Sequence, residues 1–239
     1  MAKLHLWHRY IGISVSVLVI ILSITGLLLN FSDSLKLNRS YAGASWLLKH
    51  YNIGDFPVVS FQSRNTVISQ ASNYIYLDGR YALNLSESLV GVINLSSDLL
   101  IATQSSLILI DKEGQIIDEI GNYSGLPESP LGISVTEQGH PVIRGVNTYW
   151  KGSNELSAWQ PLEGPHPQWV APIATPNNLN TLIQQHARSN EIHYERVILD
   201  LHSGRLLGNW GQNIMSIAAI LVIVLAVTGI FIWLRKKPT

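Results

Sequence analysis

Cysteine is absent from the 239-residue sequence. This absence excludes disulfides, cysteine-ligated zinc, iron–sulfur clusters, covalently attached c-type haem and thiol catalysis. An excess of charge is also missing, because 16 basic residues balance 16 acidic ones. A general nucleic-acid binder needs a basic excess, so no nucleic-acid partner is expected. Charged residues make up only 13% of the chain, about half the usual share in soluble domains.

The shortage of charge comes from two uncharged, proline-free runs at residues 10–29 and 214–234. A helix of about 20 residues crosses a hydrocarbon core of about 30 Å, so both runs predict membrane spans in a lipid bilayer. The first run is alternatively a cleaved signal peptide, but its length and the sequence after Asn30 favour retention. Each span also carries a small polar sequence, Ser23–Gly26 and Ala226–Gly229, which is typical of close helix packing.

Basic residues flank the spans on one side, with Lys3 and Arg9 before the first and Arg235, Lys236 and Lys237 after the second. Cytoplasmic loops carry the excess of lysine and arginine, so both termini are predicted to be cytoplasmic. The predicted segments are a cytoplasmic N-terminus 1–9, a first span 10–30, an extracytoplasmic domain 31–209, a second span 210–234 and a cytoplasmic C-terminus 235–239.

The region between the spans is predicted to be mainly β, after one or two short helices over residues 33–52. Three segments, at 67–85, 100–120 and 141–159, each suggest two strands, a tight turn and a third strand. They predict either a meandering stack of small sheets or a partial propeller completed by another chain, and chance similarity is the alternative. The fold class is therefore a membrane α-helical hairpin plus a mainly β extracytoplasmic domain with propeller-like or meander repeats.

The end of this region contains three further elements. Prolines at 165, 167, 172 and 176 predict an extended crossing over 164–176, and a short helix follows through Ala187. Residues 192–201 are predicted to form a strand. Glu191, His193 and Glu195 would share one face of that strand, where an exposed polar face is favoured over a metal site, so no metal ligand is assigned.

Three of the eight histidines lie near the predicted membrane boundaries, His5 and His8 before the first span and His202 before the second. Neutral imidazole is a good ligand for haem iron. His8 is predicted at the inner face of the membrane, where the second span offers Trp233 and Arg235. His202 is predicted at the outer face, where the first span ends in Asn30. Haem b would therefore need two copies of the chain or a partner protein. The favoured alternative is that both histidines are interfacial and bind backbone or lipid headgroups.

The sequence at the two ends resembles a known family. The segments that carry the resemblance are Leu6–Gly12 with Leu22–Gly26, and Asp200–Gly208 with Leu225–Gly229. They are similar to the first and last helices of the PepSY-associated transmembrane helix family, of which this chain would be a short, two-helix member. Larger relatives include inner-membrane ferric-siderophore reductases that hold haem between histidines. The resemblance implies His8 and His202 as the candidate haem ligands.

The leading hypothesis is a PepSY-type accessory protein of a bacterial inner membrane. Its periplasmic domain would bind a ligand or a partner, namely another membrane or periplasmic protein or a second copy, in iron uptake or redox handling. No catalytic residue is assigned, and an enzyme is not favoured. The alternatives are a haem-dependent transmembrane electron carrier, like a ferric-siderophore reductase, that acts as a dimer, and a structural subunit of a larger envelope complex.

Overall fold

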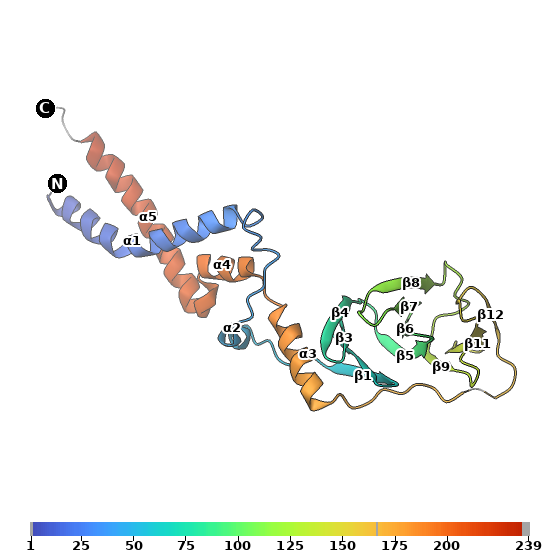
Figure 1. Cartoon of the computed structure of the whole chain (residues 1–239). Helices are drawn as coiled ribbons and strands as arrows, with labels where there is room; N and C mark the ends of the chain where they lie inside the picture. Colours follow the sequence, from blue (N-terminus) through green and yellow to red (C-terminus); the bar gives the residue numbers. More distant parts are fainter. Residues whose placement is uncertain (1, 166, 236–239) are drawn as a thin grey trace. The chain divides into compact units, whose positions relative to one another are not determined.

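The computed structural model describes residues 2–165 and 167–235 (Figure 1). The chain divides into two compact units, which are treated separately below. One consists of residues 1–51 and 189–239, and we call it the helical unit. The other consists of residues 52–188, and we call it the β unit. The helices of the helical unit are α1 (Ala2–Asn30), α2 (Ser45–His50), α4 (Tyr194–His202), the 3₁₀ turn η1 (Arg205–Leu207) and α5 (Gly208–Leu234).

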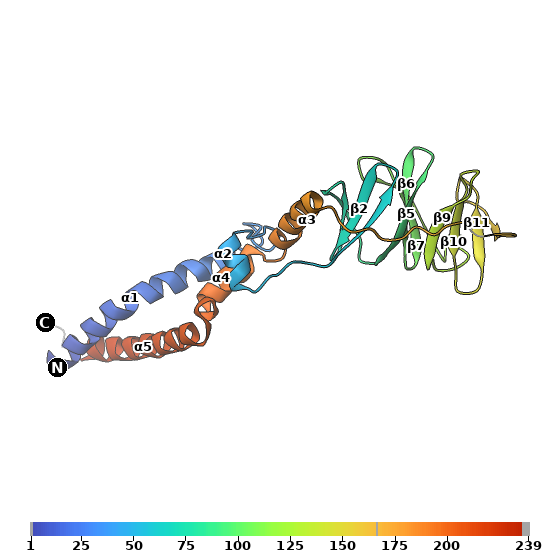
Figure 2. The same ribbon diagram turned by 90° about the horizontal axis from the view of Figure 1, so that it is seen from below.

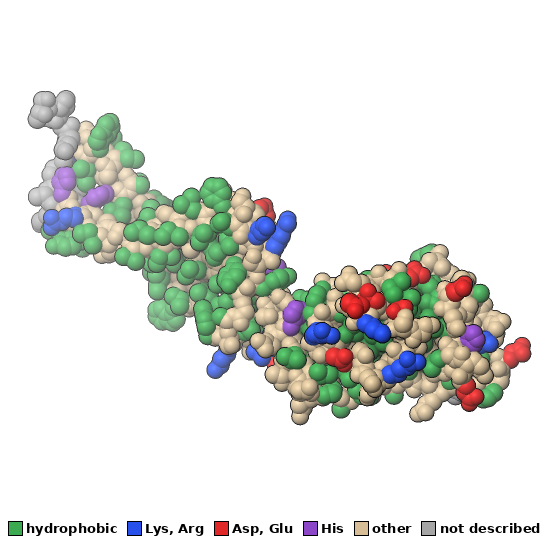
Figure 3. Space-filling view, viewed as in Figure 1, with side chains coloured by type: hydrophobic (Ala, Val, Ile, Leu, Met, Phe, Trp, Pro, Cys, Tyr) green, Lys and Arg blue, Asp and Glu red, His purple; other side chains and the backbone are tan. Residues whose placement is uncertain are grey.

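Two helices, α1 and α5, are long and apolar enough to cross a membrane. They contact each other along the helical unit, and apolar side chains run along both of them (Figure 3). Few of these side chains are buried, since large residues such as Ile13 and Ile223 are about two-thirds exposed. A helix that is apolar all round needs an apolar solvent. Trp7, Trp210 and Trp233 are exposed near the helix ends, as membrane-belt residues are.

Residues 194–202 form the helix α4, so the prediction of a strand over 192–201 is wrong. Its short apolar run, Val197 to Leu199, is compatible with either structure, because periodicity does not decide such runs. An ion pair between Arg196 and Asp200, 2.9 Å apart, links positions i and i+4 and favours the helix. With no strand, Glu191 and His193 share no strand face. The described residues contain no cluster of histidine and carboxylate side chains that could hold a metal.

The β unit contains three four-stranded antiparallel sheets, each with its strands in chain order. The strands of the first sheet are β1 (Val58–Ser63), β2 (Thr66–Ala71), β3 (Tyr74–Leu77) and β4 (Arg80–Asn84). Those of the second are β5 (Leu89–Leu95), β6 (Asp98–Thr103), β7 (Ser106–Ile110) and β8 (Ile116–Gly121). Those of the third are β9 (Gly132–Val135), β10 (Pro141–Arg144), β11 (Tyr149–Gly152) and β12 (Trp159–Pro161).

The mainly β prediction is confirmed, and the three predicted segments correspond to strands two to four of each sheet. The first strand of each sheet was missed. In Figure 2 the three sheets follow one another within the β unit, and β5 packs against both β1 and β9. Apolar side chains fill the space between neighbouring sheets in two clusters, one around Ile68 and Ile101 and one around Leu107 and Ile143. The described residues form three open sheets and no closed barrel or propeller.

The described residues of the proline-rich segment 164–176 form an extended crossing, as predicted. Its backbone binds the first strands of two sheets: Val170 N donates to Ile133 O over 3.1 Å, and Ile173 N donates to Ser60 O over 2.8 Å. It leads into α3 (Asn177–Ser189), whose Ile183 and Ala187 are fully buried and pack with Tyr76 of the first sheet. The segment therefore connects the last sheet back to the first.

Candidate functional site

The first candidate site residue, His8, lies near the start of α1 and contacts the last third of α5. Its Nδ1 is 2.9 Å from the hydroxyl Oγ1 of Thr228. The next residue, Gly229, lies beside the ring, since a Cβ built there would stand 3.5 Å from His8 Cε1, which is ordinary van der Waals contact. Thr228 and Gly229 of α5 therefore both lie against the imidazole ring of His8 on α1.

The second candidate, His202, repeats this arrangement in the opposite sense. It ends α4, and its Nδ1 is 2.8 Å from Oγ1 of Thr25 on α1. A Cβ on Gly26 would stand 3.6 Å from His202 Cε1. Thr25 is only 4% exposed, so this hydrogen bond is shielded from solvent. The helical unit thus has two histidine–threonine pairs, one toward each end of the α1–α5 hairpin.

Sequence reasoning assigned the two threonine–glycine dipeptides to helix packing and gave the histidines other neighbours. In the structure, each threonine–glycine dipeptide contacts a histidine ring. The actual partners, Thr228 and Thr25, lie within the helices, five residues before Trp233 and before Asn30. Each span contains a small–x–Thr–Gly sequence, Ser23–Gly26 or Ala226–Gly229, and its combination with a boundary histidine elsewhere in the chain is the signal that would have identified these pairs. In both rings Nδ1 lies within hydrogen-bond distance of a threonine hydroxyl.

The two imidazoles cannot bind the same iron atom. His8 and Thr25 are 17 positions apart on α1, which corresponds to about 25 Å of helix. Since His202 binds Thr25, the histidines lie toward opposite ends of the hairpin. His5, three positions before His8, is exposed. Among the described residues, one chain therefore places one such histidine toward each end, and a haem held there would need a further ligand from another molecule.

A buried carboxylate holds α4 in place beside this site. Asp200 is 3% exposed, and its Oδ2 accepts hydrogen bonds from Tyr51 Oη at 2.8 Å and from Arg196 Nε at 2.9 Å. Burial, followed by the hydrogen bond and the charge of Asp200, raises the pKa of Tyr51 to about 12. Tyr51 thus stays a neutral donor at physiological pH. Because Asp200 precedes His202 by two residues, this bond also positions the histidine.

Two glycines allow the chain to reverse between α4 and α5. Gly204 has φ +76°, and a Cβ on it would stand 2.3 Å from Gly211 O. A Cβ on Gly211 would stand 2.1 Å from Gly204 O. Only glycine permits backbones to approach this closely. The Asp200–Gly208 sequence and Gly211 therefore build the corner that carries His202.

The β unit has its own concave surface where β1, β5 and β9 end. This cavity of about 570 Å³ is lined by the turns that follow these strands. Its lining combines polar side chains, among them Arg64, Asn94, Glu137 and Asn154, with apolar ones such as Val92 and Val135. Asn94 Nδ2 donates to Ser63 Oγ at 2.6 Å, which leaves its carbonyl oxygen toward other donors. Such a surface suits a polar ligand or a segment of a partner protein.

The net charge of zero is the sum of opposite formal charges on the two units. Residues 52–188 contain twelve acidic and six basic residues, so the β unit has a formal charge of −6. Residues 1–51 and 189–239 contain four acidic and ten basic residues, so the helical unit has a formal charge of +6. A partner of the β unit is therefore attracted when its own surface is basic.

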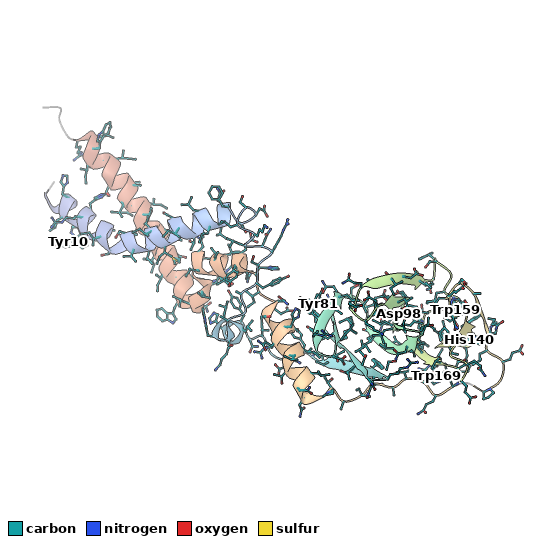
Figure 4. The ribbon with its side chains drawn as sticks, in the orientation of Figure 1. Tyr10, Tyr81, Asp98, His140, Trp159 and Trp169 are labelled. Atoms are coloured by element: carbon teal, nitrogen blue, oxygen red, sulfur yellow. The ribbon has the colours of Figure 1, made fainter. Side chains whose placement is uncertain are left out.

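One further histidine has a structural role. His186 on α3 stacks on Tyr81 of the first sheet, with ring centroids 5.0 Å apart; Tyr81 is labelled in Figure 4. The Nδ1 of His186 is 3.1 Å from the hydroxyl of the fully buried Tyr76. Burial lowers the pKa of His186. The neutral ring therefore joins α3 to the sheet.

The fold and site define a membrane protein with two apolar helices and a β-rich unit. The sequence model of the PepSY-associated TM region matches residues 128–239, which confirms the resemblance for this part of the chain. Residues 128–239 are thus similar to the PepSY-associated TM region. The match includes the third sheet, the corner at Asp200–Gly208 and α5, whereas Leu6–Gly26 lies outside it. No curated protein matches the chain.

Proposed function

We propose that the chain is a PepSY-type accessory protein of a bacterial inner membrane, with the β unit in the periplasm binding a partner or ligand in iron uptake or redox handling. The family match and the two apolar helices support the membrane anchor. The observation that carries the binding role is the cavity at the ends of β1, β5 and β9. The link to iron rests on the family resemblance.

The pairing of His8 with Thr228 supports the proposed orientation. It brings the start of α1 beside the end of α5, so Arg9 and Arg235 flank the same end of the hairpin. Basic residues gather on the cytoplasmic side of membrane proteins. Lys236 and Lys237, which contribute to the same prediction, lie outside the described residues.

The absence of cysteine allows a clean test, because a single introduced cysteine is the only thiol. Glu137→Cys places it at the rim of the cavity, and Glu119→Cys places it on β8 away from the cavity with the same change of charge. A membrane-impermeant maleimide should label both variants in intact spheroplasts. Labelling that requires permeabilised cells would contradict the periplasmic assignment.

The same two variants test the binding surface. A photoreactive maleimide at position 137 should crosslink one specific protein or ligand in native membranes, whereas the probe at position 119 should not. Capture should weaken as salt rises, because the β unit is acidic. Equal crosslinking from both positions, or none from position 137, would contradict the cavity as the binding surface. A chain that always purifies alone would count against the accessory role.

A second candidate function is a haem-dependent transmembrane electron carrier that acts as a dimer. The histidine–threonine pairs favour it, because iron-binding histidines commonly have their other ring nitrogen held by a hydrogen bond. Two copies would supply two His8 rings toward one end and two His202 rings toward the other. A haem held there would supply one-electron transfer. These residues fit one axial ligand each per chain.

The visible spectrum decides between the two functions. After haem supplementation and purification in mild detergent, the electron carrier predicts a Soret band that is lost in His8→Ala and His202→Ala. Full haem retention by both variants would refute the ligand assignment. No Soret band in the wild type would eliminate the haem function and leave the accessory function.

A further inference from the structure

The hydroxyl groups of Thr25 and Thr228 each donate their proton to a backbone carbonyl oxygen. Thr228 Oγ1 lies 2.7 Å from Val224 O and 3.2 Å from Leu225 O, within its own helix. A hydroxyl has one hydrogen to donate and two lone pairs that accept. A carbonyl oxygen only accepts, so the short contact to Val224 O uses the threonine proton. The contact between Thr228 Oγ1 and His8 Nδ1 therefore needs a proton from the histidine.

Thr25 shows the same geometry on the other helix. Its Oγ1 lies 2.7 Å from Ile21 O and 3.2 Å from Leu22 O, and it accepts from His202 at 2.8 Å. If the threonine donated to the ring instead, two oxygen atoms would face each other at 2.7 Å with no proton between them. In a low-dielectric setting such an unpaired contact is costly. In both pairs, therefore, the ring N–H donates a hydrogen bond to the threonine hydroxyl, and the hydroxyl donates one to a backbone carbonyl.

We infer that Thr25 and Thr228 are positioning residues that fix His202 and His8 in the Nδ1–H tautomer. In neutral imidazole one ring nitrogen carries the proton and the other carries a lone pair. Fixing the proton on Nδ1 places the lone pair of each ring on Nε2. The hairpin then presents one Nε2 electron-pair donor toward each end. The matching ligand is an electron-pair acceptor, namely haem iron or another transition-metal ion.

The tautomer itself follows from hydrogen bonds alone, whereas the identity of the acceptor rests on the proposed haem function. The two parts are separable. A tautomer can be measured in protein without haem or metal. A failure of haem binding would leave the tautomer unaffected, and a wrong tautomer would be seen whether or not haem binds.

The test uses protein labelled with ¹⁵N at histidine, purified without haem, and long-range ¹H–¹⁵N correlation of the ring nitrogens at pH 8. His8→Gln and His202→Gln assign the two rings. The expected result for the wild type is a protonated Nδ1 and an unprotonated Nε2 in both rings. Protonated Nε2 in either ring, in the neutral or the doubly protonated form, would overturn the inference for that ring.

Threonine variants test the cause. Thr228→Val keeps the shape and removes the hydroxyl, so the His8 ring should lose its Nδ1–H preference while His202 keeps it. Thr25→Val should do the reverse, and Thr→Ser at either position should preserve the wild-type pattern. An unchanged His8 ring in Thr228→Val would overturn the positioning role. If haem binds, the valine variants should also lose about 10- to 100-fold in affinity, as the loss of such supporting bonds does elsewhere.

Discussion

Substitution of Gly204 by alanine tests the corner that carries His202. The φ of +76° disfavours any residue with a Cβ by about 1–2 kcal/mol. The added methyl would also stand 2.3 Å from Gly211 O, so backbone has to move. Forced overpacking typically costs about 1–3 kcal/mol. Gly204→Ala should therefore destabilise the helical unit by about 2–5 kcal/mol.

Two other glycines provide matched controls for this prediction. Gly208 also has positive φ, but no atom lies within 4 Å of its added Cβ, so Gly208→Ala should cost only about 1–3 kcal/mol of backbone strain. Gly12 lies within α1 with open space around it, so Gly12→Ala should be neutral or stabilising by up to about 1 kcal/mol. Unfolding by SDS in mixed micelles, followed by circular dichroism, measures all three. A Gly204→Ala protein as stable as the Gly12→Ala protein would refute the reasoning.

Three further predictions concern individual polar contacts. Burial lowers the pKa of His186, so the folded β unit binds fewer protons than the unfolded chain below pH about 6.5. The stability of the β unit is therefore full above pH about 6.5 and falls as the pH drops through the folded pKa of His186. Thermal melts should show this loss of stability, and His186→Phe should reduce it. Hydrogen bonds from Ser105 and Thr103 lower the pKa of Glu87. Glu87→Gln should therefore lower the free energy of unfolding by about 1 kcal/mol at pH 7, measured by chemical denaturation. The difference in stability between wild type and variant should shrink as the pH falls below about 4. Tyr51→Phe should cost about 1–3 kcal/mol in SDS unfolding, because Asp200 loses a buried donor, and an unchanged midpoint would contradict the role of this bond.

The sequence was sufficient for the features that depend on long or repeated patterns. Two uncharged runs gave the spans, proline spacing gave the extended crossing, and turn residues gave three strands of each sheet. The first strand of each sheet precedes the repeated order of two strands, a tight turn and a third strand, so the prediction that used this order did not include it.

The sequence was insufficient where a contact joins distant segments. The helix α4 was mistaken for a strand because its apolar run is short, although the spacing of Arg196 and Asp200 was a usable signal. Thr25 and Thr228 each resemble ordinary packing residues on their own helices. Their role becomes visible only when the hairpin places His202 and His8 against them.

The histidine–threonine pairs can be checked in the spectrum of the histidine ring nitrogens of the wild-type protein, in nanodiscs and without haem. We expect both His8 and His202 to carry the proton on Nδ1 and the lone pair on Nε2. A spectrum in which both rings carry the proton on Nε2 would contradict the histidine–threonine pairs and the ligand role that we draw from them.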